Sequence, residues 1–297
     1  MSAQPRSFPL GDDRRRPAPV RRPPGKHIVL DRALESLPLF RLSDSAEEAS
    51  ILYTPPAGGR WRVLPSPGDR LPGTFDQDVY VEICRRFLDA GEPADGAVSF
   101  TLHSFLRSIG RRADGRTYEQ LRAALNRLER TSLESHAAYY NATAGHPLDG
   151  RFTVLSAVSI DRRRVADREQ LALFPNVTTA EPGDARVTLS PLVRGNIAQG
   201  HATSLVAAQY QALSSPVARR LYRLLEVARA EDTVTWRIEL EALAEQMPLV
   251  QRYPSHLQRV LQPAHEMLVA AGLVRDALVH QQDRTWYVDY VLAMRTA

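Results

Sequence analysis

The stretch from Val98 to Arg130 reads VSFTLHSFLRSIGRRADGRTYEQLRAALNRLER, and its apolar spacing predicts a short strand followed by two helices. A related pattern returns near the C-terminus. The apolar residues Val98, Phe100, Leu121 and Leu125 have counterparts 136 residues later (234 − 98) at Val234, Trp236, Leu257 and Leu261. We interpret this recurrence as one structural module that the chain carries twice.

Each copy continues into two segments of alternating polarity that predict a β-hairpin. In the first copy these are residues 133–141 and 151–160, joined by a loop around Gly145, Pro147 and Gly150. In the second copy they are residues 273–280 and 285–293, with a turn at 282–284. The order strand, short helix, longer helix and hairpin is typical of a winged helix, a form of helix-turn-helix. The expected fold class is α+β, with two tandem winged-helix domains and β-hairpin wings.

Local signals divide the chain into five parts. We expect a disordered Arg/Pro-rich tail at 1–27, a hairpin lead-in at 28–72, a first winged-helix domain at 73–165, a linker at 166–202 and a second winged-helix domain at 203–297. Thr74 to Gln77 has the form of a capping box, and Ser215 precedes Pro216 as an N-cap does. Residues 204–213 predict a further helix.

The charge of the chain is concentrated in its tail. Of the net charge of +4, residues 1–25 account for all, with six arginines against two aspartates, so the remaining body is neutral. DNA binding must therefore rest on local patches, and residues 107–130 hold seven arginines against three acids. The chain has no apolar run of 18 residues, which predicts no membrane span, and its one cysteine, Cys84, lies in an apolar pattern. We expect a cytoplasmic protein.

We expect the polar faces of the two longer helices to carry the side chains that read DNA. Arginine forks match guanine and phosphate, whereas asparagine and glutamine match adenine. The candidates in the first copy are Arg111, Arg112, Arg116, Thr117, Gln120, Arg122, Asn126, Arg127 and Arg130. Those in the second copy are Ser255, His256, Gln258, Arg259 and Gln262, with Arg284 in the hairpin turn. We expect both copies to contact DNA, and we expect the first copy to supply the larger part of the electrostatic attraction to DNA. The alternative is that these faces are only the solvated sides of amphipathic helices.

Several short motifs resemble the bacterial plasmid replication initiator protein A family. They are Phe40-Arg41-Leu42-Ser43, the run from Pro72 to Tyr80, Gly115 to Tyr118, Leu125 to Thr131, Ser215 to Tyr222, Tyr253-Pro254-Ser255 and Leu261 to Glu266. Their order and spacing cover most of residues 40–280. The resemblance implies a sequence-specific double-stranded DNA-binding replication initiator that recognises repeated sites at a plasmid-type origin. It also implies recruitment of the host replicative helicase and a contact with the host initiator, and it leaves a homodimer open.

Two other functions are compatible with parts of the sequence. A winged-helix transcriptional regulator would use the same helices, although we find no separate sensor segment. A tyrosine recombinase would use an H-x-x-R motif such as His256 to Arg259 with Tyr287 or Tyr290 as nucleophile, but no matching upstream arginine motif accompanies it. The sequence has no nucleotide-binding P-loop, its histidines are scattered, and one cysteine cannot build a thiolate zinc site. We therefore expect no enzyme, no cofactor and no metal.

Overall fold

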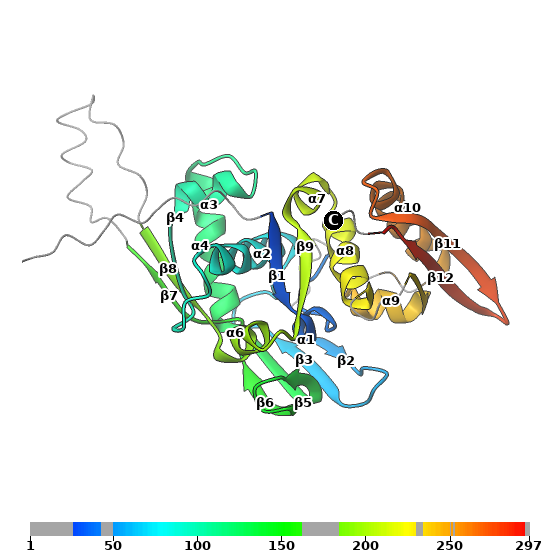
Figure 1. The fold of residues 1–297 in the computed structure, drawn as a ribbon, viewed down its shortest axis with the longest axis horizontal. Helices are drawn as coiled ribbons and strands as arrows, with labels where there is room; N and C mark the ends of the chain where they lie inside the picture. The colour runs from blue at the N-terminus through cyan, green and yellow to red at the C-terminus, as the bar shows by residue number, and fades with distance from the viewer. Residues whose placement is uncertain are drawn as a thin grey trace, which may run out of the picture.

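Two lobes lie along the long axis of the molecule, with the helix α8 (Pro216–Arg229) between them (Figure 1). The computed structural model describes residues 26–42, 50–161, 184–229, 234–249, 251 and 253–294. The expected disordered tail lies, up to residue 25, outside the described residues.

The first lobe contains the strand and two helices that the sequence predicts. β4 (Ala97–Thr101) runs into α3 (Leu102–Ser108), and α4 (Gly115–Arg130) follows after a turn. Thr101 caps α3 by accepting a hydrogen bond from the Ser104 N–H at 3.0 Å, and Asp114 caps α4 by accepting one from the Thr117 N–H at 3.0 Å. The predicted stripe of α4 is fully buried at Leu121, Ala124, Leu125 and Leu128. It packs toward α2 (Thr74–Asp89) and α3.

The start of α2 differs from the expected capping box. Gly73 is the N-cap, and its N–H donates to the Asp76 carboxylate at 2.7 Å. Thr74 and Gln77 therefore do not form the box. The side chain of Gln77 is instead buried and accepts a hydrogen bond from Arg223 at 2.6 Å, a partner 146 residues away that local sequence spacing does not reveal.

The second lobe repeats this order. β10 (Thr235–Glu239) leads into α9 (Leu240–Gln246), α10 (Pro254–Ala270) follows, and β11 (Val274–Gln282) and β12 (Thr285–Leu292) form the hairpin. The three strands pair in the order β10-β12-β11, all antiparallel. The turn residues Asp283 and Arg284 both have positive φ, 49° and 71°, as a two-residue hairpin turn of type I′ requires. The predicted second hairpin is confirmed.

The strand and two helices of the first lobe and those of the second lobe, here called the two units, correspond at a longer sequence offset than the sequence suggested. β4 and β10 begin 138 residues apart (235 − 97), and so do α3 and α9 (240 − 102). In the longer helices the buried positions of α4 correspond at an offset of 140 (261 − 121) to Leu261, Ala264, His265 and Leu268. The offset of 136 was therefore wrong, and Val234 is 57% exposed where Val98 is 3% exposed. A slip of two residues in a strand, or of four in a helix, keeps the same face, which explains the apolar matches.

The first hairpin also differs from the prediction. Residues 133–141 and 151–160 pair only at Leu133 with Phe152 and Glu134 with Arg151, because β5 (Ser132–Asn141) pairs with β6 (His146–Phe152), which lies mostly in the expected loop. β5 and β6 join a sheet of order β2-β3-β5-β6. β2 (Ile51–Tyr53) and β3 (Arg60–Leu64) form the expected lead-in hairpin of that sheet. The counterpart of the second hairpin is β7 (Leu155–Ile160) with β8 (Asp184–Leu189), in a sheet of order β4-β8-β7. β8 thus lies within the segment 166–202 that was expected to be a linker.

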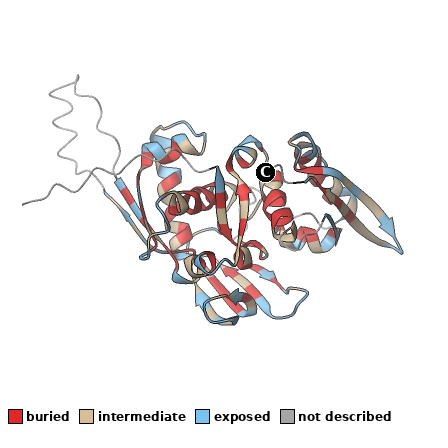
Figure 2. Ribbon diagram, in the orientation of Figure 1, coloured by how far each residue is buried: buried red, intermediate tan, exposed pale blue. Residues whose placement is uncertain are grey.

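The N-terminal segment and the residues after β8 pack together between the lobes. β1 (His27–Asp31) pairs antiparallel with β9 (Ala202–Val206), and α1 (Arg32–Glu35) and α6 (Pro191–Ala198) flank the pair. The helix expected at 204–213 is shorter, α7 (Ala207–Ala212), because residues 202–206 are a strand with alternating burial. Buried residues, red in Figure 2, occur in both lobes and along α8. Cys84 is buried, as expected.

Candidate nucleic-acid interface

The face of α4 opposite its apolar stripe, with the turn before it, is the most basic predicted surface. Arg111, Arg112, Arg116, Gln120 and Arg130 are all exposed there. The Arg112 side chain is 89% exposed and lies 3.9 Å from Asp114, while that of Arg111 is 51% exposed and lies 3.8 Å from Asp78. These ion pairs are long, so both guanidinium groups stay accessible to a ligand. Arg107, on α3, is also exposed and extends the same basic stretch.

Arg127 was expected to read a base, and the structure contradicts this. Its side chain is only 8% exposed, and its Nε and Nη2 each lie 3.0 Å from the Asp76 carboxylate. Asp69 lies 3.8 Å from its Nη1 on the other side. The guanidinium therefore ties α4 to the start of α2 and cannot contact a base in this arrangement.

Two more predicted residues on α4 have partners within the protein, and a third is half-buried. Thr117 completes the cap, because its Oγ1 donates to the Arg112 carbonyl at 2.5 Å. Arg122 is 23% exposed and lies 2.6 Å from Glu119. Asn126 is half-buried at the edge of the face. The accessible surface of α4 is thus narrower than expected and lies toward its N-terminal half, with Arg130 at the other end.

The second longer helix presents the face that its sequence predicts. Ser255, His256, Arg259 and Gln262 are exposed, and Gln258 is half-buried. Gln262 donates to Glu266 at 2.9 Å one turn later. Pro263 lies inside α10 on this exposed side. Arg284 is exposed at the tip of the β11–β12 hairpin.

The N-termini of the two helices differ in charge. At α4 the Asp114 carboxylate occupies the N-cap, and the hydrogen bond from the Thr117 N–H lowers the pKa of that carboxyl. At α10 the N-cap is Tyr253, Pro254 follows at the first position, and no described side chain caps the helix. The His256 and Leu257 N–H groups of α10 both donate to the Tyr253 carbonyl, at 2.9 and 3.0 Å, and Pro254 has no N–H, so the Ser255 N–H is the donor left at this end. Because a helix N-terminus attracts anions, α10 carries no carboxylate cap that would oppose a phosphate, whereas α4 does. The first unit therefore offers more arginines, and the second offers the helix end without a carboxylate cap.

A cluster on the outer face of the second sheet was not found from the sequence. Arg237 on β10 lies over the Tyr287 ring at 4.3 Å and 3.6 Å from Asp289, both on β12. It also contacts His280 at 3.2 Å and Gln282 on β11. Alternation within each strand puts these residues on one face, but the pairing of β10 with β12 had to be known to bring them together.

The side chains of the recombinase alternative are not assembled in the described residues. Tyr290 is fully buried and lies 2.8 Å from His265, and burial raises the pKa of its hydroxyl. Tyr287 is stacked under Arg237 on the outer face of the sheet. Neither arrangement presents a tyrosine hydroxyl beside His256 and Arg259.

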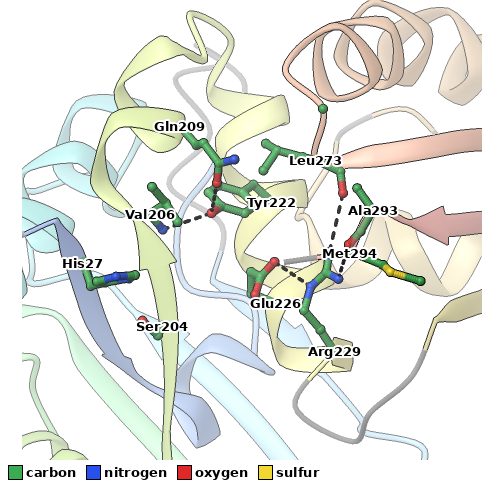
Figure 3. Close-up of a pocket in the computed structure, with 11 residues that line it drawn as sticks. His27, Ser204, Val206, Gln209, Tyr222, Glu226, Arg229, Leu273, Ala293 and Met294 are labelled. Carbon is green, nitrogen blue, oxygen red and sulfur yellow. Dashed lines mark hydrogen bonds and ion pairs between the residues drawn. The ribbon is translucent and has the colours of Figure 1, made fainter. Parts of the chain in front are cut away.

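Other ligand chemistry has little geometric basis in the part of the chain that the structure describes. Among these residues, no group of three His, Cys, Asp or Glu side chains could hold a metal ion, and no helix is long and apolar enough to cross a membrane. A pocket of about 120 Å³ lies where β9 and α8 meet the end of β12 (Figure 3). Arg229 lines it and binds Glu226 at 2.8 Å and the Ala293 carbonyl at 2.5 Å. This arginine thus ties α8 to the hairpin.

The comparisons with known proteins agree with this fold. The family model described as replication initiator protein A matches residues 30–267. A search of the curated proteins finds no match. Among solved structures, the chain is similar to the Pi initiator protein in complex with iteron DNA, at a TM-score of 0.52 and 11% identity over 92% of this chain and 100% of that one. It is also similar to domains 2 and 3 of RctB, at a TM-score of 0.51 and 11% identity over 86% and 95% of the two chains.

These two measures carry different weight. An identity of 11% shows a shared fold and no more. The family match, in contrast, extends from β1 to α10 and spans both structural units. The chain belongs to the replication initiator protein A family.

Proposed function

We propose that the chain is a sequence-specific, double-stranded DNA-binding replication initiator that recognises repeated sites at a plasmid-type origin. Family membership over residues 30–267 carries the proposal. The Pi initiator, whose fold the chain shares, is described in a complex with iteron DNA. The exposed polar faces of α4 and α10 supply the side chains that such binding needs.

In this proposal each unit is a winged helix. The first runs from α2 to β8 and the second from α8 to β12, with α4 and α10 as the helices that enter the major groove and the β7–β8 and β11–β12 hairpins as wings. The three-stranded sheets β4-β8-β7 and β10-β12-β11 support it, because each pairs the strand before the helices with the hairpin after them. The residues before α2, together with β9, form a support between the two units.

The two reading helices use different chemistry. Arg112, in the turn before α4, and Arg116, on α4, bind phosphates, and Gln120 on α4 reaches a base edge. On α10, the N-terminus with Ser255 holds a phosphate, and Arg259 reads a guanine. Exposure and charge support this division.

The proposed partners follow from the family. They are double-stranded DNA, the host replicative helicase and the host initiator, with a homodimer left open. The protein acts without catalysis of its own, in the cytoplasm with plasmid DNA. Autoregulation of its own promoter would use the same two helices.

A footprint on the DNA flanking its own gene tests the function. Protected direct repeats beside an AT-rich stretch are expected. A single palindrome over a promoter would favour a transcriptional regulator, and a covalent tyrosine–DNA adduct would favour a recombinase. Arg259→Ala should weaken binding by about 1 to 3 kcal/mol if it reads a guanine. Arg60 is an exposed arginine on β3, so Arg60→Ala is the matched control and should leave the footprint unchanged.

A further inference from the structure

The helix α8 has a second face that is polar and yet buried. Opposite the apolar stripe that packs on α10, it carries Arg219, Arg220 and Arg223, of which none is exposed. Arg219 lies 2.6 Å from Asp78 on α2, and Arg223 donates to Gln77 on the same helix at 2.6 Å. We call these three arginines the α8 seam. The seam joins the second unit to the first.

Arg220 has the widest set of partners in the seam. Its Nη1 donates to the Glu35 carbonyl at 3.0 Å and lies 3.1 Å from the Glu35 carboxylate. Its Nη2 donates to the Leu37 carbonyl at 2.9 Å and to the Gln246 carbonyl at 3.1 Å. Gln246 is the last residue of α9, where a helix leaves its carbonyls without intrahelical partners. One guanidinium thus bridges the N-terminal segment and the helix that precedes α10.

Gln246 makes a second contact across the same junction. Its side-chain amide donates to the Tyr53 hydroxyl on β2 at 3.1 Å. The end of α9 is therefore attached to the N-terminal half through its carbonyl and through its side chain. Both attachments are directional hydrogen bonds, which constrain rotation as well as distance.

The seam is a costly way to hold two units together. Glu35 is 1% exposed and shared by Arg220 and Arg223, each with a nitrogen 3.1 Å from its carboxylate. Burial, with the neighbouring Arg223 charge, lowers the pKa of Arg220 to about 10, so the group remains charged at neutral pH. Replacing buried ion pairs by apolar residues is often neutral or stabilising, so such pairs are weak evidence for stability. Their forked geometry instead favours one relative orientation.

We propose that Arg220 is a positioning residue that fixes the orientation of the α10 unit relative to the α4 unit, and with it the spacing between the two DNA segments that the chain binds at once. The inference rests on the proposed function. Inserting one base pair between two binding segments turns the second by about 34° and moves it by about 3.4 Å, since B-DNA has about 10.5 base pairs per turn of about 36 Å. A rigid seam makes binding sensitive to such insertions, and a loose seam does not.

The variant Arg220→Lys tests this on the full chain, because lysine keeps the charge and loses the fork. Affinity is measured on the footprinted DNA with zero, one or two base pairs inserted between the protected segments. For the wild type we expect at least a tenfold loss at two inserted base pairs, and for Arg220→Lys less than a threefold loss. Arg229→Lys is the matched control, since its partners Glu226, Leu273 and Ala293 all lie within the second unit. Arg229→Lys should lose the same affinity as the wild type at each number of inserted base pairs.

A measurement without DNA separates the inference from the proposed function. Spin labels at Glu119→Cys and Glu266→Cys, both exposed, report the distance between α4 and α10, and the buried Cys84 does not compete for label. Arg220→Lys should broaden this distance distribution. If Arg220→Lys does not fold, Tyr53→Phe removes the second attachment, keeps the ring, and should broaden it to a smaller degree.

The outcomes are distinct. The positioning role would be overturned if folded Arg220→Lys lost as much affinity as the wild type at each insertion, or if its spin-label distance distribution were unchanged, while the wild type still protects repeats. Absence of any protected DNA for the wild type would overturn the proposed function and the DNA part of the inference together. A wild type that tolerates every insertion would overturn the inference alone.

Discussion

A substitution at Arg127 can separate a structural role from a DNA-reading role, because stability and DNA affinity can be measured separately. Replacing it by methionine keeps the aliphatic stem and removes the guanidinium. The Asp76 carboxylate, 0% exposed, would then still accept the hydrogen bond from the Gly73 N–H at 2.7 Å but would no longer be paired with the buried Arg127 guanidinium. Breaking a buried ion pair by removing one partner costs about 3 to 5 kcal/mol. A domain usually has a free energy of unfolding of about 5 to 15 kcal/mol, so this loss is large, but a domain of more than about 5 kcal/mol would remain folded.

Urea unfolding measures this cost, and fluorescence anisotropy with labelled DNA measures affinity under conditions where the variant is folded. We expect a large drop in the free energy of unfolding and an affinity per folded molecule close to that of the wild type. Adding Asp76→Asn should recover part of the lost stability, since it removes the uncompensated charge. Arg116→Met is the matched control on the exposed side of α4. Its unfolding free energy should change by less than about 0.5 kcal/mol, while its DNA affinity should fall.

The opposite result would refute the reasoning. If Arg127→Met changes the free energy of unfolding by less than about 1 kcal/mol and weakens DNA binding tenfold or more, the guanidinium leaves Asp76 to reach DNA. The side chain would then be a reader that the unbound structure holds folded back.

Three further predictions concern pH, backbone geometry and salt. Burial lowers the pKa of His265 to about 4, so the folded protein holds it neutral while the unfolded chain takes up a proton below about 6.5. The contribution of neutral His265 to the free energy of unfolding is complete above pH 6.5 and falls by up to about 3 kcal/mol between pH 6.5 and 4. The difference in urea midpoint between the wild type and His265→Gln should therefore decrease over this pH range, and a difference independent of pH would contradict the prediction. Gly59→Ala should lower the free energy of unfolding by more than about 1 kcal/mol, since φ is +87° and the new Cβ would lie 2.7 Å from the Ala137 carbonyl oxygen. Gly58→Ala is the control, because Gly58 has a similar φ but open space around it, and an equal loss of stability in the two variants would argue against the steric cause. Arg116→Gln should reduce the slope of log affinity against log salt by about 0.9 if the arginine binds a phosphate, and an unchanged slope would remove it from the interface.

The hairpins show which part of the fold local sequence can predict. The second hairpin has a two-residue turn at Asp283 and Arg284, so its strands are neighbours in sequence and their alternation suffices. The first is assembled from β7 and β8, whose paired ends Ile160 and Ala185 are far apart in sequence, while β5 and β6 offer an equally good alternation in between. Alternation identifies strands but does not choose partners among several, so the wrong pair was predicted.

The errors in the candidate site have a related cause. A hydrophobic stripe reveals one neighbour of a helix, and the remaining residues are then assumed to face water. On α4 and α8, charged residues outside the stripe are also buried. Arg127 on α4 meets Asp76 of α2, and Arg220 on α8 meets Glu35 of α1, in both cases through charge rather than apolar area. The polar face of α10 was predicted to be exposed, and Ser255, Arg259 and Gln262 are exposed in the structure.

These buried pairs also change the meaning of the neutral charge of the body. Outside residues 1–25, the basic and acidic residues balance, which argued against a basic surface. Part of that balance is internal, because the carboxylates of Glu35, Asp76 and Glu82 are buried and paired with Arg220, Arg127 and Arg85. Charges neutralised inside the protein contribute little to the field at its surface. The exposed Arg111 and Arg112 before α4 are opposed at 3.8 and 3.9 Å by Asp78 and Asp114, so the field there is set by local geometry and not by the sum over the chain. A neutral body is therefore compatible with a surface that attracts DNA, and the arginine excess over lysine serves both the buried forks and that surface.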